Sequence, residues 1–192
     1  MNRQELEHIV QAAADIIGQN EFVIVGSQSI LGKFPDAPRS LRQSMELDIY
    51  PQGRPELAEL ISGCLGEYSP FHSTFDYYAD GVAPNTSTLP IGWEDRLVRF
   101  SNENTHGAVA CCLDPLDLAY AKLAAGRPKD LNCVVELTRY HFIKPSALVR
   151  LIEQVEDPAL KKTMTERWQV VQTKKLTLEQ PSQFIRPPGM KM

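Results

Sequence analysis

The stretch Met45-Glu46-Leu47-Asp48-Ile49-Tyr50 decides the fold, because apolar and acidic residues alternate along it. Side chains on a strand point to opposite faces with a period of two. The apolar side chains therefore anchor the strand on one face, and Glu46 and Asp48 project together from the other. Hard cations such as Mg²⁺ commonly take one or two carboxylates together with substrate phosphates and water. We interpret the stretch as a metal-holding strand; the alternative is a half-buried strand whose polar face meets water.

The residues around this strand predict an α/β core. Apolar residues recur at helical spacing over residues 3–17, and a continuous apolar run at 22–25 has the length of a buried strand. Gly26-Ser27 then breaks the chain before a short helix at 28–31. A further helix is expected at 55–65, with a proline near its first turn.

Three more strands are expected in the middle of the chain. Aromatic residues are enriched at 74–82, and a period of two places Asp76 and Asp80 on one face of that strand. Residues 96–100 and 108–113 predict a hairpin. The predicted fold is therefore α/β (α+β), with a mixed sheet of about five strands flanked by helices.

The pattern becomes helical from Asp114 onward and predicts a C-terminal helical bundle. Helices are expected at 115–125, 129–140, 145–155 and 158–173, each but the second opened by a proline. We therefore divide the chain into an α/β core (1–113), a helical region packed on the core (114–173) and an extended tail (174–192).

Composition limits the classes of function. The chain has 192 residues, 43% of them hydrophobic, and a formal net charge of −4, which argues against a dedicated nucleic-acid binder. The four cysteines show no metal-binding spacing and are expected to be reduced. No secretory leader and no membrane-length apolar run is visible, so a cytoplasmic protein without membrane contact is expected.

A second unusual stretch spans residues 117–130, Asp-Leu-Ala-Tyr-Ala-Lys-Leu-Ala-Ala-Gly-Arg-Pro-Lys-Asp. Lys122 lies among small and apolar neighbours, and a glycine and a proline break the helix just behind it. The break brings Arg127, Lys129 and Asp130 close to that lysine. Such a basic corner suits a polyphosphate; the alternative for the two later cations is a helix end whose charges complement the macrodipole.

The three motifs, in this order, resemble those of the nucleotidyltransferase superfamily. They are Val25-Gly26-Ser27, Glu46-Leu47-Asp48 and the 117–130 stretch, and the likeness covers roughly residues 20–140. It is closest to the DUF6036 group, related to the AbiEii-type toxin nucleotidyltransferases. The resemblance implies transfer of a nucleoside monophosphate from a nucleoside triphosphate (NTP) to an unknown acceptor, which could be a protein, an RNA or a small molecule.

The resemblance also implies roles for individual residues. Gly26 and Ser27 would cradle the triphosphate, Glu46 and Asp48 would hold Mg²⁺, Lys122 and Arg127 would contact phosphate, and Asp130 would orient Lys122 or act at the acceptor. Active members need a third carboxylate, which would also be the third metal ligand. Asp80 is the first candidate for it and Asp76 the second.

One further class of function stays open beside the enzyme. Glu46 stands where the superfamily more often has Asp, and no motif fixes the third carboxylate. A catalytically weak or inactive binding protein of the same fold is therefore the alternative, for example a toxin–antitoxin or phage-defence component with an antitoxin partner. For Trp93 and Arg96, a place in the core is favoured over stacking on a base.

Overall fold

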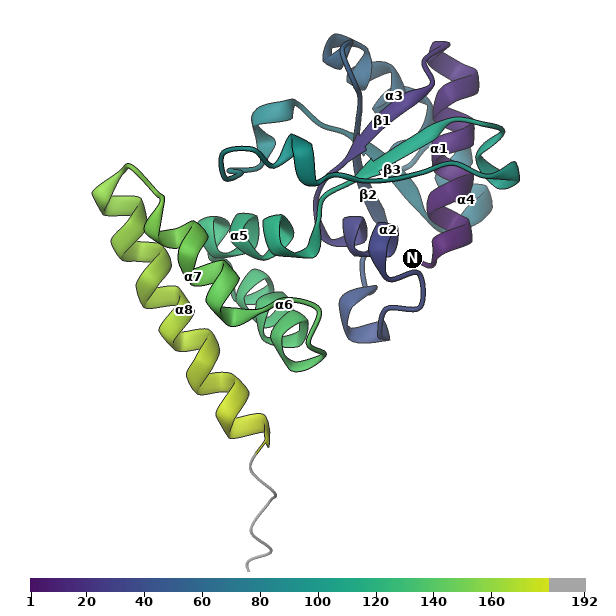
Figure 1. Cartoon of the computed structure of the whole chain (residues 1–192). Coiled ribbons are helices and arrows are strands. Elements are labelled where there is room, and N and C mark those ends of the chain that lie inside the picture. Colours follow the sequence, from purple (N-terminus) through teal and green to yellow (C-terminus); the bar gives the residue numbers. More distant parts are fainter. Residues whose placement is uncertain (180–192) are drawn as a thin grey trace, which may run out of the picture.

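Five strands and eight α-helices make up the part of the chain that the computed structural model describes, residues 1–179 (Figure 1). The strands are β1 (Glu21–Ile24), β2 (Glu46–Pro51), β3 (Tyr78–Gly81), β4 (Val98–Phe100) and β5 (Val109–Cys112). The α-helices are α1 (Arg3–Ile17), α2 (Ile30–Lys33), α3 (Ala58–Leu65), α4 (Pro70–Phe75), α5 (Pro115–Ala125), α6 (Pro128–Arg139), α7 (Pro145–Glu153) and α8 (Pro158–Glu179). The predicted α/β class is confirmed.

The strands form one mixed sheet in the order β3-β2-β1-β5-β4. β1 is antiparallel to β2 and parallel to β5, β2 is parallel to β3, and β4 and β5 form the predicted antiparallel hairpin. The register pairs Asp48 on β2 with Asp80 on β3. The sheet therefore places two of the candidate carboxylates on adjacent strands.

The two faces of the sheet are buried in different ways. Phe22, Ile24 and Leu47 belong to the main apolar cluster, which includes Leu6 and other residues of α1. α1 begins with a capping box between Asn2 and Glu5. The opposite face carries a smaller cluster of Val23, Val25, Tyr50, Ala58, Val82, Cys111 and Leu113, against which Leu89, Trp93 and Leu97 pack. Glu46 and Asp48 share this second face with Tyr50.

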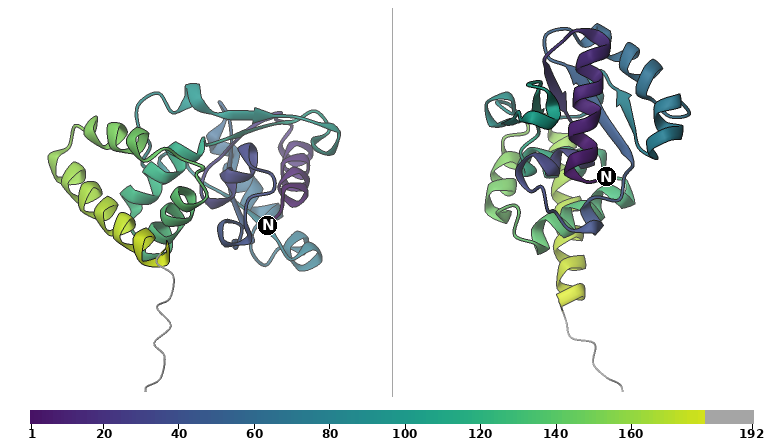
Figure 2. Two further views of the ribbon diagram at one scale, coloured as in Figure 1. Left: turned by 60° about the horizontal axis from the view of Figure 1, so that its bottom comes forward. Right: turned by 90° about the vertical axis from the view of Figure 1, so that its right-hand side faces the viewer.

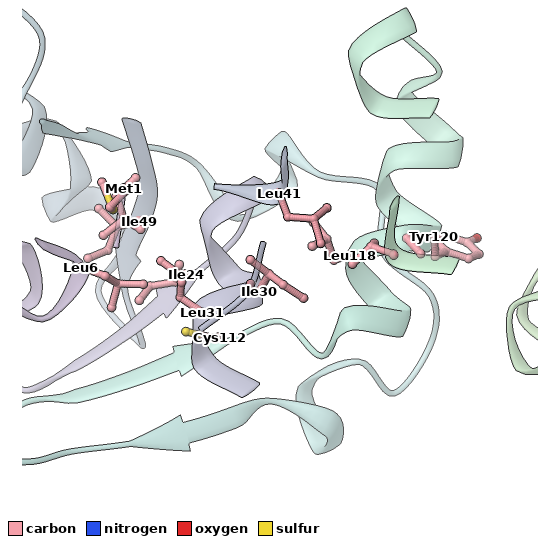
Figure 3. Packing of buried hydrophobic residues seen from close by; sticks show 14 of the residues in the cluster. Met1, Leu6, Ile24, Ile30, Leu31, Leu41, Ile49, Cys112, Leu118 and Tyr120 are labelled. Atoms are coloured by element: carbon pink, nitrogen blue, oxygen red, sulfur yellow. The ribbon is translucent and has the colours of Figure 1, made fainter. Parts of the chain in front are cut away.

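The main apolar core continues without a break from the sheet into the helical region. Figure 3 shows Ile24 and Ile49 of the sheet, then Ile30 and Leu41, and then Leu118 of α5, all members of one buried cluster. α8 runs along the outer side of the helical region (Figure 2). The buried cluster therefore joins the sheet and the helices into a single packed unit.

The end of the chain departs in part from prediction. α8 continues to Glu179, so residues 174–179 are helical where an extended tail was expected. The rest of that predicted tail, 180–192, lies outside the described residues. Among residues 1–179, no helix combines the length and apolar character needed to cross a lipid bilayer.

The prediction of a strand over 74–82 is wrong in its first half. Ser69 accepts a hydrogen bond from the His72 amide and Pro70 occupies the first turn, so the chain is helical as α4 up to Phe75. Asp76 ends that helix in the left-handed conformation, with φ of 62°. β3 starts only at Tyr78, and Asp76 does not share a strand face with Asp80.

Candidate functional site

Three carboxylates come together on the second face of the sheet. Glu46 and Asp48 come from β2 and Asp80 from β3, and a ligand oxygen of each lies within 4.8 Å of the others. The parallel register sets Asp80 beside Asp48, and the period of two sets Glu46 on the same face. Within residues 1–179, no lysine, arginine or histidine forms a salt bridge with any of the three.

The crowding of negative charge perturbs Asp48. Burial, the charge of Glu46 and a hydrogen bond shared with Glu46 raise the pKa of Asp48 to about 7, against an ordinary value of 3.8. Asp80 adds to the rise, and the charge of Lys122 opposes it. Because three acidic oxygens converge without a paired cation, the residues present fit a bound divalent metal ion.

The predicted Gly26-Ser27 corner lies directly against Asp48. The chain leaves β1 through Val25, whose amide donates to the Asp48 carbonyl oxygen at 3.0 Å. Gly26 then adopts φ of 67°, and a short 3₁₀ helix, Ser27–Ser29, follows. A β-carbon added to Gly26 would meet Asp48 Oδ2 at 1.8 Å. The backbone can approach the carboxylate this closely only because residue 26 has no side chain.

The basic corner is built around a buried aspartate. α5 ends at Gly126 in the left-handed conformation and α6 begins two residues later. Lys122 Nζ lies 3.2 Å from Asp130 Oδ1, and Arg127 Nε lies 2.6 Å from Asp130 Oδ2. Burial would raise the pKa of Asp130, but hydrogen bonds and charge from Arg127 and Lys122 hold it below its ordinary value. Asp130 is therefore an anion that fixes two cations.

A cleft of about 1680 Å³ lies between the sheet and the helical region. Its lining includes Gly26, Ser27, Glu46 and Asp48 from the core and Lys122, Arg127 and Asp130 from α5 and α6. Asp80 is exposed and belongs to the carboxylate cluster but not to the lining of the cleft, whereas Asp76 lies outside both.

Several polar residues of the site had no role in the sequence prediction. Ser44 and the consecutive hydroxyls at 86–88 line the cleft, and they lie in loops or in the short 3₁₀ turn Pro84–Thr86, which have no periodic pattern. Tyr78 and Ser62 contact Glu46 and Asp80 respectively. Tyr78 could have been found, since it precedes Asp80 by two positions on the same strand; Ser62 comes from a helix and gave no such signal.

Comparison with known protein families supports the class predicted from the sequence, a nucleotidyltransferase. A family described as "Nucleotidyltransferase of unknown function (DUF6036)" matches residues 4–177, and the chain belongs to this family. The DUF6036 prediction is thus confirmed, whereas the relation to AbiEii-type toxins stays a prediction. Comparisons with curated proteins and with solved structures gave no match.

Proposed function

We propose that the protein is a Mg²⁺-dependent nucleotidyltransferase that moves a nucleoside monophosphate from an NTP to the hydroxyl of an acceptor. The observation that carries this proposal is the convergence of Glu46, Asp48 and Asp80 within 4.8 Å of one another, next to the cleft that Lys122 also lines. Membership of the family supports the general reaction class. The metal ion and the substrates go beyond what family membership supports and are our own proposal.

The carboxylates would hold the metal and the glycine corner would admit the triphosphate. Glu46 and Asp48 are half-buried on a strand, which fixes their positions better than a loop would. Bound Mg²⁺ would supply neutralisation of the charge on the transferred phosphate and on the leaving oxygen. The missing side chain of Gly26 lets the backbone of the Gly26-Ser27 corner lie directly against Asp48, where it would meet a triphosphate bound through the metal.

The remaining residues divide between the acceptor and the leaving group. Asp80 is exposed, so it is the carboxylate that an acceptor hydroxyl could reach and to which it could give its proton. Lys122 would offset the charge that develops on pyrophosphate. Asp130 is buried behind Lys122 and bound to two cations, which suits a positioning residue and not a base at the acceptor.

The alternative, a binding protein that has lost catalysis, was motivated by an unplaced third carboxylate. Asp80 lies within metal-sharing distance of Glu46 and Asp48, so that motive is weakened. A glutamate at the first position still presents a carboxylate oxygen to the cluster. The geometry therefore favours the enzyme.

The test is transfer from each of four α-labelled NTPs with Mg²⁺, with protein, RNA and small-molecule fractions supplied as acceptors. Wild-type protein should label one fraction and release pyrophosphate, and Asp48→Asn should do neither. Asp15→Asn, which changes an exposed aspartate of α1, is the matched control and should retain activity. Lack of both labelling and NTP binding across all four nucleotides would overturn the proposal.

A further inference from the structure

A tyrosine on β3 contacts one of the candidate metal ligands. The register pairs Tyr78 with Glu46, and the Tyr78 hydroxyl donates to Glu46 Oε2 at 3.3 Å. The ring of Tyr78 also packs against the ring of His72, with 4.7 Å between the ring centroids. Glu46 is therefore restrained by a neighbour on the next strand.

A serine on α3 plays the corresponding part for the exposed carboxylate. Ser62 Oγ donates to Asp80 Oδ1 at 3.3 Å and accepts the Gly81 amide at 2.7 Å. α3 can come this close because residue 81 is glycine: a β-carbon there would lie 1.8 Å from the Ala58 carbonyl oxygen. The contact between helix and strand thus sets the place of the hydroxyl that touches Asp80.

We propose that Tyr78 and Ser62 are positioning residues that aim Glu46 and Asp80 at a shared divalent cation. The inference rests on the proposed metal site and assigns the side chains that organise it. Hydrogen bonds to ligating groups orient them, and loss of such a partner typically costs about 10- to 100-fold in metal affinity. Asp48 is confined in another way, because the Gly26 backbone lies directly against its carboxylate.

The chemistry of Tyr78 suits a permanent donor. A phenolic hydroxyl can donate one hydrogen bond, and the Tyr78 hydroxyl donates it to the Glu46 carboxylate. The adjacent Tyr77 points to the opposite side of the strand, where its hydroxyl is 2.7 Å from His8 Nδ1. The two tyrosines therefore form a natural pair of test and control.

Isothermal titration calorimetry of the full chain with Mn²⁺, used as a substitute for Mg²⁺, tests the role of the tyrosine. Tyr78→Phe keeps the ring and removes only the hydroxyl, and we expect Mn²⁺ affinity to fall about tenfold or more. Tyr77→Phe should bind Mn²⁺ as the wild type does. Equal affinity of Tyr78→Phe and the wild type, with both folded by circular dichroism, would overturn the role of Tyr78.

The serine is tested by loss and rescue. Ser62→Ala removes the hydroxyl and should weaken Mn²⁺ binding, while Ser62→Thr retains a hydroxyl and should restore most of it. Ser73→Ala, on α4, is the control for a serine outside the site. Failure of the wild type to bind Mn²⁺ would remove the metal site and this inference together; normal wild-type binding with unaffected Ser62→Ala would refute the role of Ser62 alone.

Discussion

Gly26 and Asp48 are packed so tightly that the glycine has no room for a single methyl group, which would meet Asp48 Oδ2 at 1.8 Å. The positive φ of Gly26 adds a second penalty for any other residue. We expect Gly26→Ala to displace the Asp48 carboxylate and to lower nucleotidyl transfer by about 100-fold, the usual effect of a misplacement of about 1 Å. Gly107→Ala, with a positive φ but open space around it, is the control and should lose some stability but keep its activity.

Asp80 and Asp76 were rival candidates for the third carboxylate, and substitution separates them. Asp80→Asn should abolish most transfer and weaken metal binding, because Asp80 shares the cluster with Glu46 and Asp48. Asp76→Asn should change neither, since asparagine tolerates the left-handed conformation that Asp76 adopts. The transfer rate and the Mn²⁺ affinity are measured on both variants. Equal losses in the two variants would show that the carboxylate cluster is wrongly assigned.

The raised pKa of Asp48 predicts a pH dependence. A proton on Asp48 competes with the metal, so affinity should fall about tenfold for each pH unit below about 7 and level off above it. Because this carboxyl has a higher pKa in the folded than in the unfolded chain, the free energy of unfolding of the metal-free protein should fall as pH rises from about 4 to 7. Thermal shifts with and without Mg²⁺ should therefore diverge more at pH 8 than at pH 6. A Mg²⁺ effect independent of pH would contradict the assignment.

Asp130 should matter for transfer and not for metal binding. Asp130→Asn keeps the size of the side chain but removes the charge that fixes Lys122 and Arg127. We expect a loss of roughly 100-fold in transfer rate with Mn²⁺ affinity unchanged. Parallel loss of both would mean that Asp130 holds the fold of the cleft, which circular dichroism and denaturation of the variant would reveal.

Arg96 should stabilise the fold through one long-range ion pair. Its Nη2 lies 2.7 Å from Oδ1 of Asp117, a side chain with no exposed surface. Removing one partner of a fully buried pair costs about 3–5 kcal/mol, and we expect about 1–3 kcal/mol for Arg96→Ala because its side chain is 34% exposed. Arg99→Ala breaks the exposed pair with Glu21 and should cost less than about 1 kcal/mol. Urea denaturation compares the two.

Local patterns predicted the elements, and long-range contacts escaped prediction. The alternation around Asp48 and the helical spacing of 3–17 are properties of single segments, so the sequence shows them directly. α4 was missed because its aromatic residues are equally typical of strands, and a serine-proline cap decided the outcome. Arg96, the partner of Asp117, lies 21 positions away in the sequence, and no periodic pattern predicts this pair.

The candidate site could be predicted in composition but not in arrangement. The spacing of Lys122 and Asp130 suggested proximity, yet the burial of the aspartate depends on how α5 and α6 meet at Gly126. The choice between Asp80 and Asp76 depended on where β3 begins, which a single sequence leaves open. Ser62 could not be found at all, because its relation to Asp80 exists only once α3 packs on β3.

The proposed metal ligands lie on the sheet, whereas Lys122 lies on α5, in the helical region. Two neighbouring strands tied by their backbone hold the carboxylates, so their geometry is insensitive to a small rocking of the helices. The lysine, in contrast, follows every such displacement. The proposed function therefore predicts that cation affinity and turnover are separable, and that a ligand which displaces α5 and α6 from the sheet inhibits noncompetitively without releasing the ion.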